Sequence, residues 1–249
     1  KSQKVQLSFV LNGQLQNHPL VNRWKAIAKT HFTGDLWHSV WLNFQPAKNN
    51  VIFGQEWMHI QGPEYIWEEI AGVLIAMAPS HFGQGNQPLF EQLLNDMKSL
   101  IQPNARALEC YAGVGVIAIA VADRCQSIIL SEREKSAEVY FEIAKAKLAQ
   151  ETQKKLQFIT ADAAKMTTLF SDIDTVIVDP PRKGLDKSFL EALTLSKTVK
   201  QLIYVSCNFS SFQQDAEVLL KAGWKITSTK SYLFFPGTNH IELLSIFHR

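Results

Sequence analysis

The chain has few cysteines, no long hydrophobic run and almost no net charge. Only three of its 249 residues are cysteine, namely Cys110, Cys125 and Cys207, and no two of them are spaced as CxxC. An odd number of cysteines without that spacing argues against a disulfide framework and against a zinc or iron–sulfur site. We therefore expect no metal centre, and a reducing, cytoplasmic compartment.

The composition is otherwise ordinary. Apolar residues make up 46% and charged residues 19%, as in soluble globular proteins. No apolar run approaches the roughly 18 residues of a membrane span, and no basic-then-apolar leader is present. The formal charge of +2 neither indicates nor excludes nucleic-acid binding, because folding can gather scattered lysines on one face. We expect a monomer without a membrane contact, and the initial Lys1 allows for residues upstream.

Residues 1–78 hold five of the six tryptophans, Trp24, Trp37, Trp41, Trp57 and Trp67. The segment VQLSFVL alternates with a period of two and meets Asn12-Gly13, the strongest short hairpin signal. A helix-like stretch and the strand candidates DLWHSVWLNF and NVIFGQEWMHI follow. We predict a small α+β domain dominated by an antiparallel sheet. Its tryptophans are expected to fill the core rather than to stack on bases.

Residues 79–249 alternate between strands and helices. Asn86 and Pro88 predict a helix start, and an apolar stripe follows at helical spacing. The strand candidates ARALEC, SIILSE, LQFITA, DTVIVD and QLIYVS are continuous apolar runs, typical of a parallel sheet covered on both faces. The helix candidates are GVIAIAVADR, EREKSAEVYFEIAKAKLAQ, KSFLEALTL and SFQQDAEVLLKAG. The last strands, WKITSTKSYLFF and HIELLSIFH, are joined too tightly for a crossover helix and must be antiparallel.

A glycine loop follows the first strand of this region. Gly113 and Gly115 stand between a strand and a helix, where they let the backbone approach a ligand and aim helix N–H groups at it. The full dinucleotide fingerprint wants a third small residue, a condition that Ala118 meets only loosely. The loop alone therefore leaves the type of nucleotide cofactor open.

Three acidic residues at successive strand ends narrow the choice. Glu132 can accept hydrogen bonds from both ribose hydroxyls, and Asp162 can accept one from an adenine amino group. Glu109 lies where the amino-acid part of the ligand would bind, and a dinucleotide has no ammonium group that needs this carboxylate. Each acid by itself would also fit a helix cap or a solvated turn. Together they favour S-adenosyl-L-methionine over a nicotinamide cofactor.

A carboxylate, a thiol and a second carboxylate follow three neighbouring strands. Asp179 lies in TVIVDPPRKGL, Cys207 in LIYVSCN and Glu242 in FFPGTNHIE. A free cysteine is usually a buried packing residue, but a helix starting near Ser210 is expected to lower the pKa of the Cys207 thiol. Because parallel strands end at one edge of a sheet, these groups predict an active site.

The three groups match the needs of methyl transfer to uracil C5, which is a poor nucleophile. A thiolate that adds to C6 activates C5, a base then removes the C5 proton, and a further group hydrogen-bonds the ring. Cys207, Glu242 and Asp179 fit these roles in that order.

The motifs SHFGQGN, LECYAGVG, VDPPRKGL, YVSCN and FPGTNHIE occur in an order that resembles the RNA (uracil-5-)methyltransferase family, which makes 5-methyluridine in tRNA and rRNA. The resemblance covers residues 79–249 and, more weakly, NNVIFGQEWMHIQGPEYIWEEIAG before them. It implies a class I methyltransferase fold (an α/β, Rossmann-like, mostly parallel sheet), S-adenosyl-L-methionine as cofactor and RNA as substrate. It also implies Cys207 as nucleophile and Glu242 as proton acceptor. The implied contacts to cofactor or uracil are Gln84, Tyr111, the Gly113 to Val116 loop, Glu132 and Asp179.

The chain departs from the family pattern in three ways. Ala112 replaces a cysteine, Phe209 replaces a proline, and neither a β-barrel RNA-binding domain nor a cysteine-ligated cluster is visible. Two alternatives stay open: an RNA-binding protein that retains the cofactor pocket but has little activity, and a nicotinamide oxidoreductase. Enzymes that modify exocyclic amino groups carry an aromatic residue after DPP, and RNA cytosine enzymes usually carry a second cysteine there. Arg182 at that position, with Cys207, favours uracil C5 chemistry.

Overall fold

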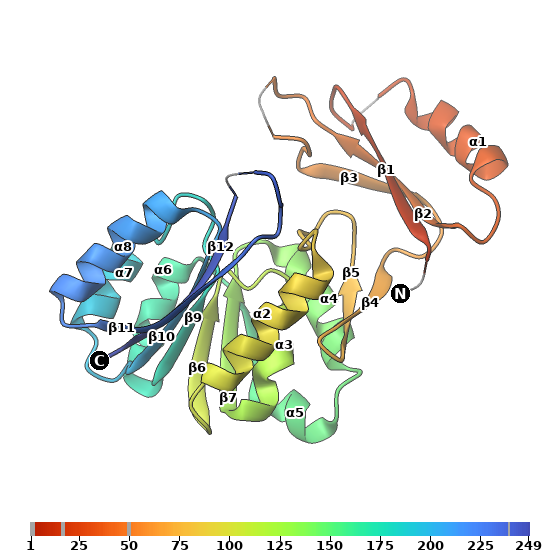
Figure 1. Cartoon of the computed structure of the whole chain (residues 1–249). Coiled ribbons are helices and arrows are strands. Elements are labelled where there is room, and N and C mark those ends of the chain that lie inside the picture. Colours follow the sequence, from red (N-terminus) through yellow and green to blue (C-terminus); the bar gives the residue numbers. More distant parts are fainter. Residues whose placement is uncertain (1–2, 16–17, 49–50, 239) are drawn as a thin grey trace. The chain divides into compact units, whose positions relative to one another are not determined.

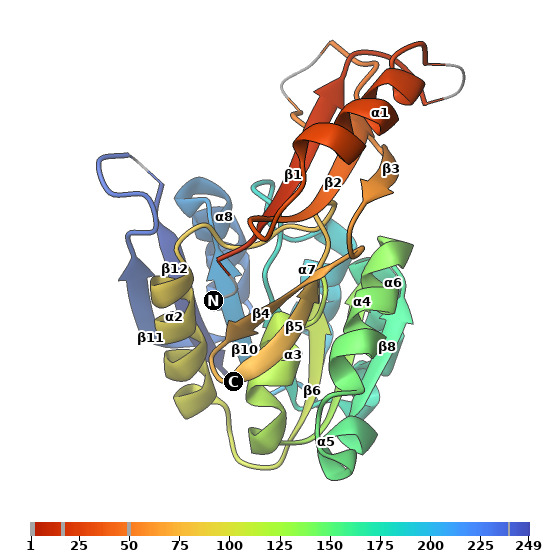
Figure 2. The same ribbon diagram turned by 90° about the vertical axis from the view of Figure 1, so that its right-hand side faces the viewer.

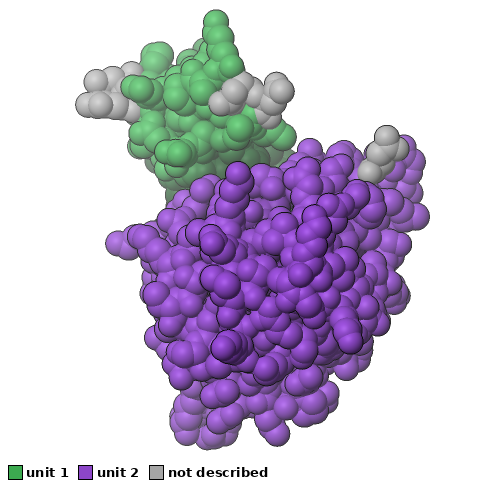
Figure 3. All heavy atoms as spheres, turned by 90° about the vertical axis from the view of Figure 1, so that its left-hand side faces the viewer, with its two compact units in different colours: residues 1–68, 76–83 green, residues 69–75, 84–249 purple. Residues whose placement is uncertain are grey.

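The computed structural model describes residues 3–15, 18–48, 51–238 and 240–249. Asn49 and Asn50, which open the weaker family stretch, and Asn239 of the FPGTNHIE motif lie outside the described residues. The chain divides into two compact units, which Figure 3 distinguishes by colour. Unit 1 comprises residues 1–68 and 76–83, and unit 2 comprises residues 69–75 and 84–249. A two-stranded sheet of β4 (Ile66–Ile70) and β5 (Val73–Met77) contributes residues to both units.

Unit 1 is built on a three-stranded sheet in the order β1-β2-β3. Its elements are β1 (Val5–Leu11), α1 (Val21–His31), β2 (Trp37–Phe44) and β3 (Glu56–Gln61). The hairpin predicted at Asn12-Gly13 is wrong, because β1 and β2 are parallel and α1 connects them. Only β2 and β3 are antiparallel, so the sheet is mixed. The helix covers apolar surface, with the Trp24 and Phe9 rings 4.0 Å apart, and this packing outweighs the local turn preference.

The tryptophans of unit 1 pack on other aromatic rings. They were expected to fill the core, and Trp41 is buried, whereas the other four are half-buried. These four pair with Phe9, Phe32, Phe53 and Tyr65 at ring-centroid distances of 4.0 to 5.4 Å. A small unit cannot enclose rings of this size completely.

Unit 2 contains a seven-stranded sheet in the order β11-β12-β10-β9-β6-β7-β8 (Figure 1). The strands are β6 (Ala105–Cys110), β7 (Cys125–Glu132), β8 (Leu156–Thr160), β9 (Thr175–Val178), β10 (Gln201–Ser206), β11 (Lys225–Tyr232) and β12 (Glu242–His248). Strands β6 to β10 are parallel, and β12 is antiparallel to both β10 and β11. The predicted α/β sheet with an antiparallel C-terminal hairpin is confirmed.

Helices cover both faces of this sheet, with α2, α3 and α4 on one face and α6, α7 and α8 on the other (Figures 1 and 2). The bounds are α2 (Gln87–Leu100), α3 (Val116–Val121), η1 (Ala122–Arg124), α4 (Lys135–Lys145), α5 (Gln150–Lys155), α6 (Ala163–Met166), η2 (Thr167–Asp172), α7 (Lys187–Leu195) and α8 (Phe209–Lys221). The predicted cap is confirmed, since the Asn86 side chain accepts a hydrogen bond from the Leu89 N–H at 3.3 Å. None of the helices within the described residues has the length and apolar character to cross a membrane.

One long helix was expected over EREKSAEVYFEIAKAKLAQ, and this prediction is wrong. The segment forms α4, a turn, and then the separate helix α5. In the turn the Lys147 N–H donates to the Ala144 oxygen at 3.0 Å, and the backbone of Ala149 is extended. The turn redirects the chain toward the start of β8, a requirement that helical periodicity does not reveal.

Candidate active site

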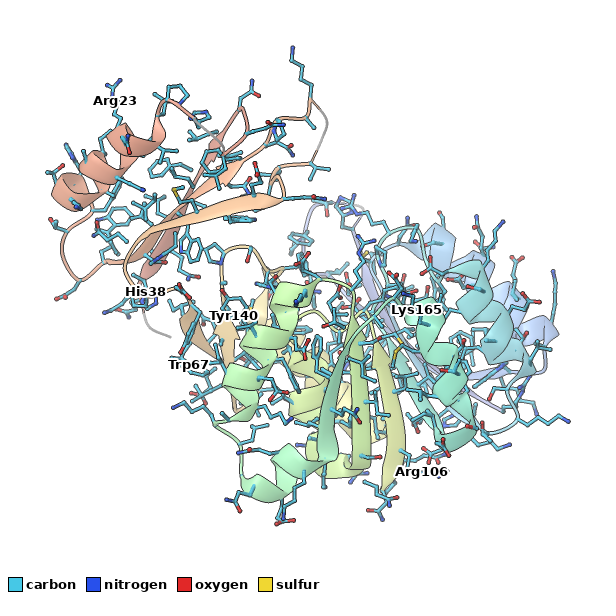
Figure 4. All side chains as sticks on the ribbon, turned by 180° about the vertical axis from the view of Figure 1, so that it is seen from behind. Arg23, His38, Trp67, Arg106, Tyr140 and Lys165 are labelled. Atoms are coloured by element: carbon cyan, nitrogen blue, oxygen red, sulfur yellow. The ribbon has the colours of Figure 1, made fainter. Side chains whose placement is uncertain are left out.

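The residues singled out by the sequence lie at the carboxyl end of the parallel sheet. Asp179 follows β9, Cys207 follows β10, and Glu242 begins the antiparallel strand β12. The opposite end is marked by Arg106, whose backbone N–H donates to the Asp174 carboxylate at 3.1 Å (Figure 4). Ligands of open α/β sheets bind outside the carboxyl ends of the strands. The sheet therefore gathers these three groups at its binding edge.

Strand register brings the thiol and one carboxyl side by side. Ser206 of β10 pairs with Leu243 of β12, so the next position places Cys207 beside Glu242. Asp179 follows Val178, which pairs with Tyr204 on the other side of β10. The charges of Glu242 and Asp179 both act on the pKa of the Cys207 thiol, as expected for groups in one site.

All three groups have raised pKa values. Burial raises the pKa of Glu242 to about 7, with the negative charge of Asp179 as a second cause, and Glu242 is only 7% exposed. Burial raises the pKa of Asp179 to about 6. The pKa of Cys207 is raised by burial and then by the two carboxylates, against the weaker effects of Arg182 and of its own N–H. The predicted lowering of the thiol pKa is therefore wrong, because burial, together with the two nearby carboxylates, outweighs the start of α8.

A buried aspartate fixes the loop that follows Asp179. Asp215, on α8, accepts hydrogen bonds from the Tyr204 hydroxyl at 2.7 Å and the Leu185 N–H at 2.9 Å. Gly184 has a φ of 81°, and a Cβ there would lie 2.7 Å from the Asp215 carboxylate. The Asn208 side chain donates to the Arg182 oxygen at 3.0 Å. Strand β10 and helix α8 thus hold the proline-rich loop beside Cys207.

Sequence reasoning missed Asp215. It lies within the buried face of α8 together with Phe212, Ala216 and Leu219. The signal available in the sequence was a charged residue on an otherwise apolar helical stripe. Such a residue indicates a buried carboxylate, and a buried carboxylate needs hydrogen-bond partners.

Tyr111 connects the glycine loop to the same proline-rich loop. Its hydroxyl donates to the Asp186 carboxylate at 3.2 Å and accepts from the Asp186 N–H at 3.4 Å. Its φ of 62° is unusual for a residue with a side chain, and it costs conformational energy. The two loops that border the predicted cofactor site are therefore linked through one half-buried side chain.

The two glycines of the loop have different roles. Gly115 has a φ of 79°, and a Cβ there would lie 2.6 Å from Phe141 and 2.8 Å from Leu130, so packing of α4 and β7 requires glycine. Gly113 has a φ of 53°, and no described atom outside its neighbours lies within 4 Å of the position of a Cβ. Its N–H donates to the Glu132 carboxylate at 3.2 Å. Gly113 therefore faces space that a ligand can occupy.

Glu109 is buried without a partner among the described residues. It is 1% exposed, and neither carboxylate oxygen has a hydrogen-bond donor in that part of the chain. Burial raises its pKa well above the usual range, and the charges of Asp179 and Glu132 add to the shift. The Ala118 N–H opposes it without reaching normal hydrogen-bond geometry. A buried carboxyl of this kind is suited to receive a cationic or N–H donor from a ligand.

The remaining predicted cofactor residues lie on four other segments of unit 2. Glu132 ends β7 and accepts hydrogen bonds from the backbone N–H groups of Arg133 and Glu134 as well as Gly113. Asp162 is exposed after β8 and makes no capping hydrogen bond within the described chain, although it occupies the N-cap of α6. Val116 begins α3 beside the glycines, and the half-buried Gln84 lies in the segment before α2.

Comparisons with known proteins bear on the family and the fold. A sequence model of the tRNA (Uracil-5-)-methyltransferase family matches residues 169–249. An uncharacterized RNA methyltransferase of Protochlamydia amoebophila is 42% identical over 251 residues, covering 100% of this chain and 65% of the relative. One of Thermosynechococcus vestitus is 32% identical over 211 residues, covering 83% and 46%. The chain thus spans about half to two thirds of the length of these relatives.

A solved structure shows the same fold. It is a tRNA (uracil-54, C5)-methyltransferase of Pyrococcus abyssi in complex with S-adenosyl-L-homocysteine. It superposes with a TM-score of 0.74 at 24% identity, over 98% of this chain and 56% of that one. The sheet and its helices are those of the class I, S-adenosylmethionine-dependent methyltransferases. On the family match, the relatives and the fold together, this chain belongs to the RNA (uracil-5-)methyltransferase family.

Proposed function

We propose that this chain transfers a methyl group from S-adenosylmethionine to C5 of a uridine in a structured RNA, either tRNA or rRNA. The observation that carries the proposal is the pairing of Cys207 with Glu242 across β10 and β12, with Asp179 on the neighbouring strand end. Family membership supports methyl transfer to RNA. The C5 position is supported by the presence of a thiol between two carboxyl groups, a set that direct transfer to nitrogen does not require.

The residues present fit S-adenosylmethionine, which supplies an electrophilic methyl group when bound. Glu109 offers a buried carboxyl for the ammonium group of S-adenosylmethionine, and Gly113 leaves room for the ligand. Glu132 stands at the end of β7, where a carboxylate accepts from ribose hydroxyls. The further contacts proposed are Gln84, Tyr111, Gly115, Val116, Asp162 and Asp179. A nicotinamide cofactor lacks the ammonium group and would leave Glu109 buried without a partner.

Cys207 is the proposed nucleophile. Its sulfur adds to C6 of the uracil, and the electron pair displaced from the C5–C6 double bond makes C5 nucleophilic. The raised pKa of the thiol means that its proton must leave as the bond forms. Glu242 and Asp179, with pKa values of about 7 and about 6, are the adjacent groups able to accept it at neutral pH.

Glu242 also completes the reaction. The thiol proton passes on to solvent, so that Glu242 is ionised again when C5 carries the methyl group. Glu242 then removes the remaining C5 proton, the C5–C6 double bond re-forms and the Cys207 thiolate leaves. A base with a pKa near the working pH is well matched to this step, which is typically worth about 10²- to 10⁴-fold in rate. Asp179, partly protonated because of its raised pKa, hydrogen-bonds the uracil ring and keeps it beside both groups.

RNA containing 5-fluorouridine tests the proposal, because fluorine cannot leave C5 as a cation and the Cys207 adduct should persist on a denaturing gel. Cys207→Ala should give no adduct, whereas Cys125→Ala, at a buried cysteine away from the site, should still form it. Glu242→Gln should accumulate the adduct even on ordinary uridine. RNA binding by the unmodified chain without any adduct would favour the alternative of a binding protein without activity.

A further inference from the structure

Exposed apolar side chains gather where β10, β11 and β12 border the proposed reaction site. Phe209 is 63% exposed and Phe235 49% exposed, and Leu233 and Ile241 are also exposed. A phenylalanine left in water forgoes the roughly 1.5–3 kcal/mol that burial contributes. Exposed apolar groups that share one location mark interaction sites. We call these four residues the apolar rim.

The strand register places three of the four rim residues beside the reacting pair, and Phe235 lies in the β11–β12 connection, 3.7 Å from the position of a Cβ on Gly85. Tyr232 of β11 pairs with Glu242, so Leu233 and Ile241 occupy the next positions beyond the carboxyl group. Extending the antiparallel β10–β12 pairing by two positions places Ile241 opposite Asn208, the residue directly before Phe209. Figure 1 shows the β11–β12 connection at the same end of the sheet as the carboxyl ends of the parallel strands.

The backbone around Phe209 is held by hydrogen bonds. It is the first residue of α8, and the Asn208 side chain before it accepts from the Ser210 N–H at 3.0 Å and donates to the Arg182 oxygen at 3.0 Å. A ring on an ordered backbone loses little conformational entropy when it binds a partner. The family pattern has proline at this position, so the ring is a property of this chain rather than of the family pattern.

Positive charge lies beside the rim. Arg182 is exposed in the loop that Asn208 holds, and it is close enough to lower the pKa of Cys207. Lys183 is exposed beside it but forms an ion pair with the Asp186 carboxylate at 2.6 Å. Aromatic side chains combined with cations are the usual means of binding single-stranded nucleic acid, where bases stack on rings and cations meet phosphates. A protein partner, or a second copy of this chain, would bury the apolar groups without requiring these cations.

We infer that Phe209 and Phe235 are stacking surfaces for the unpaired bases that flank the uridine at Cys207. This inference rests on the proposed function and narrows its substrate class to a loop or other single-stranded segment of RNA. A uridine within a continuous duplex would keep its neighbours stacked on one another and would leave both rings in water.

Phe209 can be altered without disturbing α8, which makes the test sharp. Proline is favoured at the first helical position, so Phe209→Pro removes the ring and preserves the helix. Phe209→Leu keeps an apolar side chain but removes the planar aromatic ring, and Phe209→Trp keeps an aromatic ring on which a base can stack. Leu195→Ala, at a 73% exposed leucine that ends α7, is the control for the loss of exposed apolar surface alone.

The probes are a single-stranded RNA oligonucleotide with a central 5-fluorouridine and the same sequence held in a duplex. Binding of the single strand should weaken roughly tenfold in the proline and leucine variants and should be retained in the tryptophan variant and the Leu195 control. In methyl-transfer assays on the matching uridine strand, KM should rise by more than kcat falls. A photoreactive 5-iodouridine next to the target should cross-link to the peptide that contains Phe209.

The outcomes separate this inference from the proposed function. Adduct formation with equal RNA affinity in all Phe209 variants would overturn the inference and leave the function standing. Ring-dependent RNA binding without any adduct would support the surface and contradict methyl transfer at C5. Preference for the duplex probe, or self-association of the chain that Phe209→Pro abolishes, would overturn the stacking surface in favour of another occupant.

Discussion

Replacing Glu242 with glutamine is expected to stabilise the protein at alkaline pH. Burial raises the pKa of this carboxyl from an ordinary 4.5 to about 7. Between these values the native carboxyl keeps a proton that the unfolded chain has released, so the free energy of unfolding falls as pH rises. The difference between the two pKa values corresponds to about 3 kcal/mol. Glutamine carries no charge at any pH and avoids this loss.

Urea unfolding followed by far-ultraviolet circular dichroism, repeated over a pH series, measures the effect. The two proteins should have similar stability near about pH 4.5, and the Glu242→Gln variant should be more stable by about 3 kcal/mol above about pH 7. Glu191→Gln, at an exposed glutamate on α7, removes one charge without removing a buried one and should change little.

The pH dependence of the free energy of unfolding is the decisive observation. A change in stability that is the same at every pH would indicate altered packing and not the loss of an ionisable group. Parallel stability curves for the natural chain and Glu242→Gln would show that Glu242 is ionised at no cost in the folded state, and the reasoning from burial would fail. The same variant should lose turnover, because glutamine cannot accept the C5 proton. Greater stability with loss of activity is a common feature of active-site groups held in unfavourable surroundings.

Three further predictions follow from the same geometry. The rate of adduct formation should rise with pH through the range of about 6 to about 7 set by Asp179 and Glu242, and a flat profile would argue against proton transfer to them. Gly115→Ala should lower the thermal stability clearly more than Gly113→Ala, because only the first meets a side chain at 2.6 Å; equal losses in calorimetry would remove the packing argument. Asp215→Ala should cost about 2 kcal/mol or more by leaving two buried donors unpaired, while Asp215→Asn keeps one acceptor and should cost less in the same unfolding assay.

The order of elements in unit 2 was predictable because its sheet is buried on both faces. Continuous apolar runs such as QLIYVS and DTVIVD have few alternatives to a covered parallel strand. The polar residue that ends each run then lies at one edge, and this is why Asp179 and Cys207 could be assigned to one site. The tight β11–β12 connection fixed the direction of β12, and thereby the position of Glu242.

Contacts between distant residues were not predictable. The Asn12-Gly13 signal is local, and the packing of α1 on β1 overrides it. The apolar stripe of α8 signals that Asp215 is buried, but its partners Tyr204 and Leu185 are set by the tertiary fold. A hydrogen bond across 30 residues leaves no periodic trace in the sequence.

The sequence by itself determined the chemical groups of this protein and the edge of the sheet at which they meet. That information is local, because strand ends, caps and glycine turns depend on a few adjacent residues. Only the tertiary structure decided the protonation of those groups. The start of α8 favours a thiolate at Cys207, whereas burial and the charges of Glu242 and Asp179 raise its pKa. Burial and charge proximity depend on the whole fold, so the pKa shifts of Cys207, Glu242 and Asp179 could not be obtained from the order of residues alone.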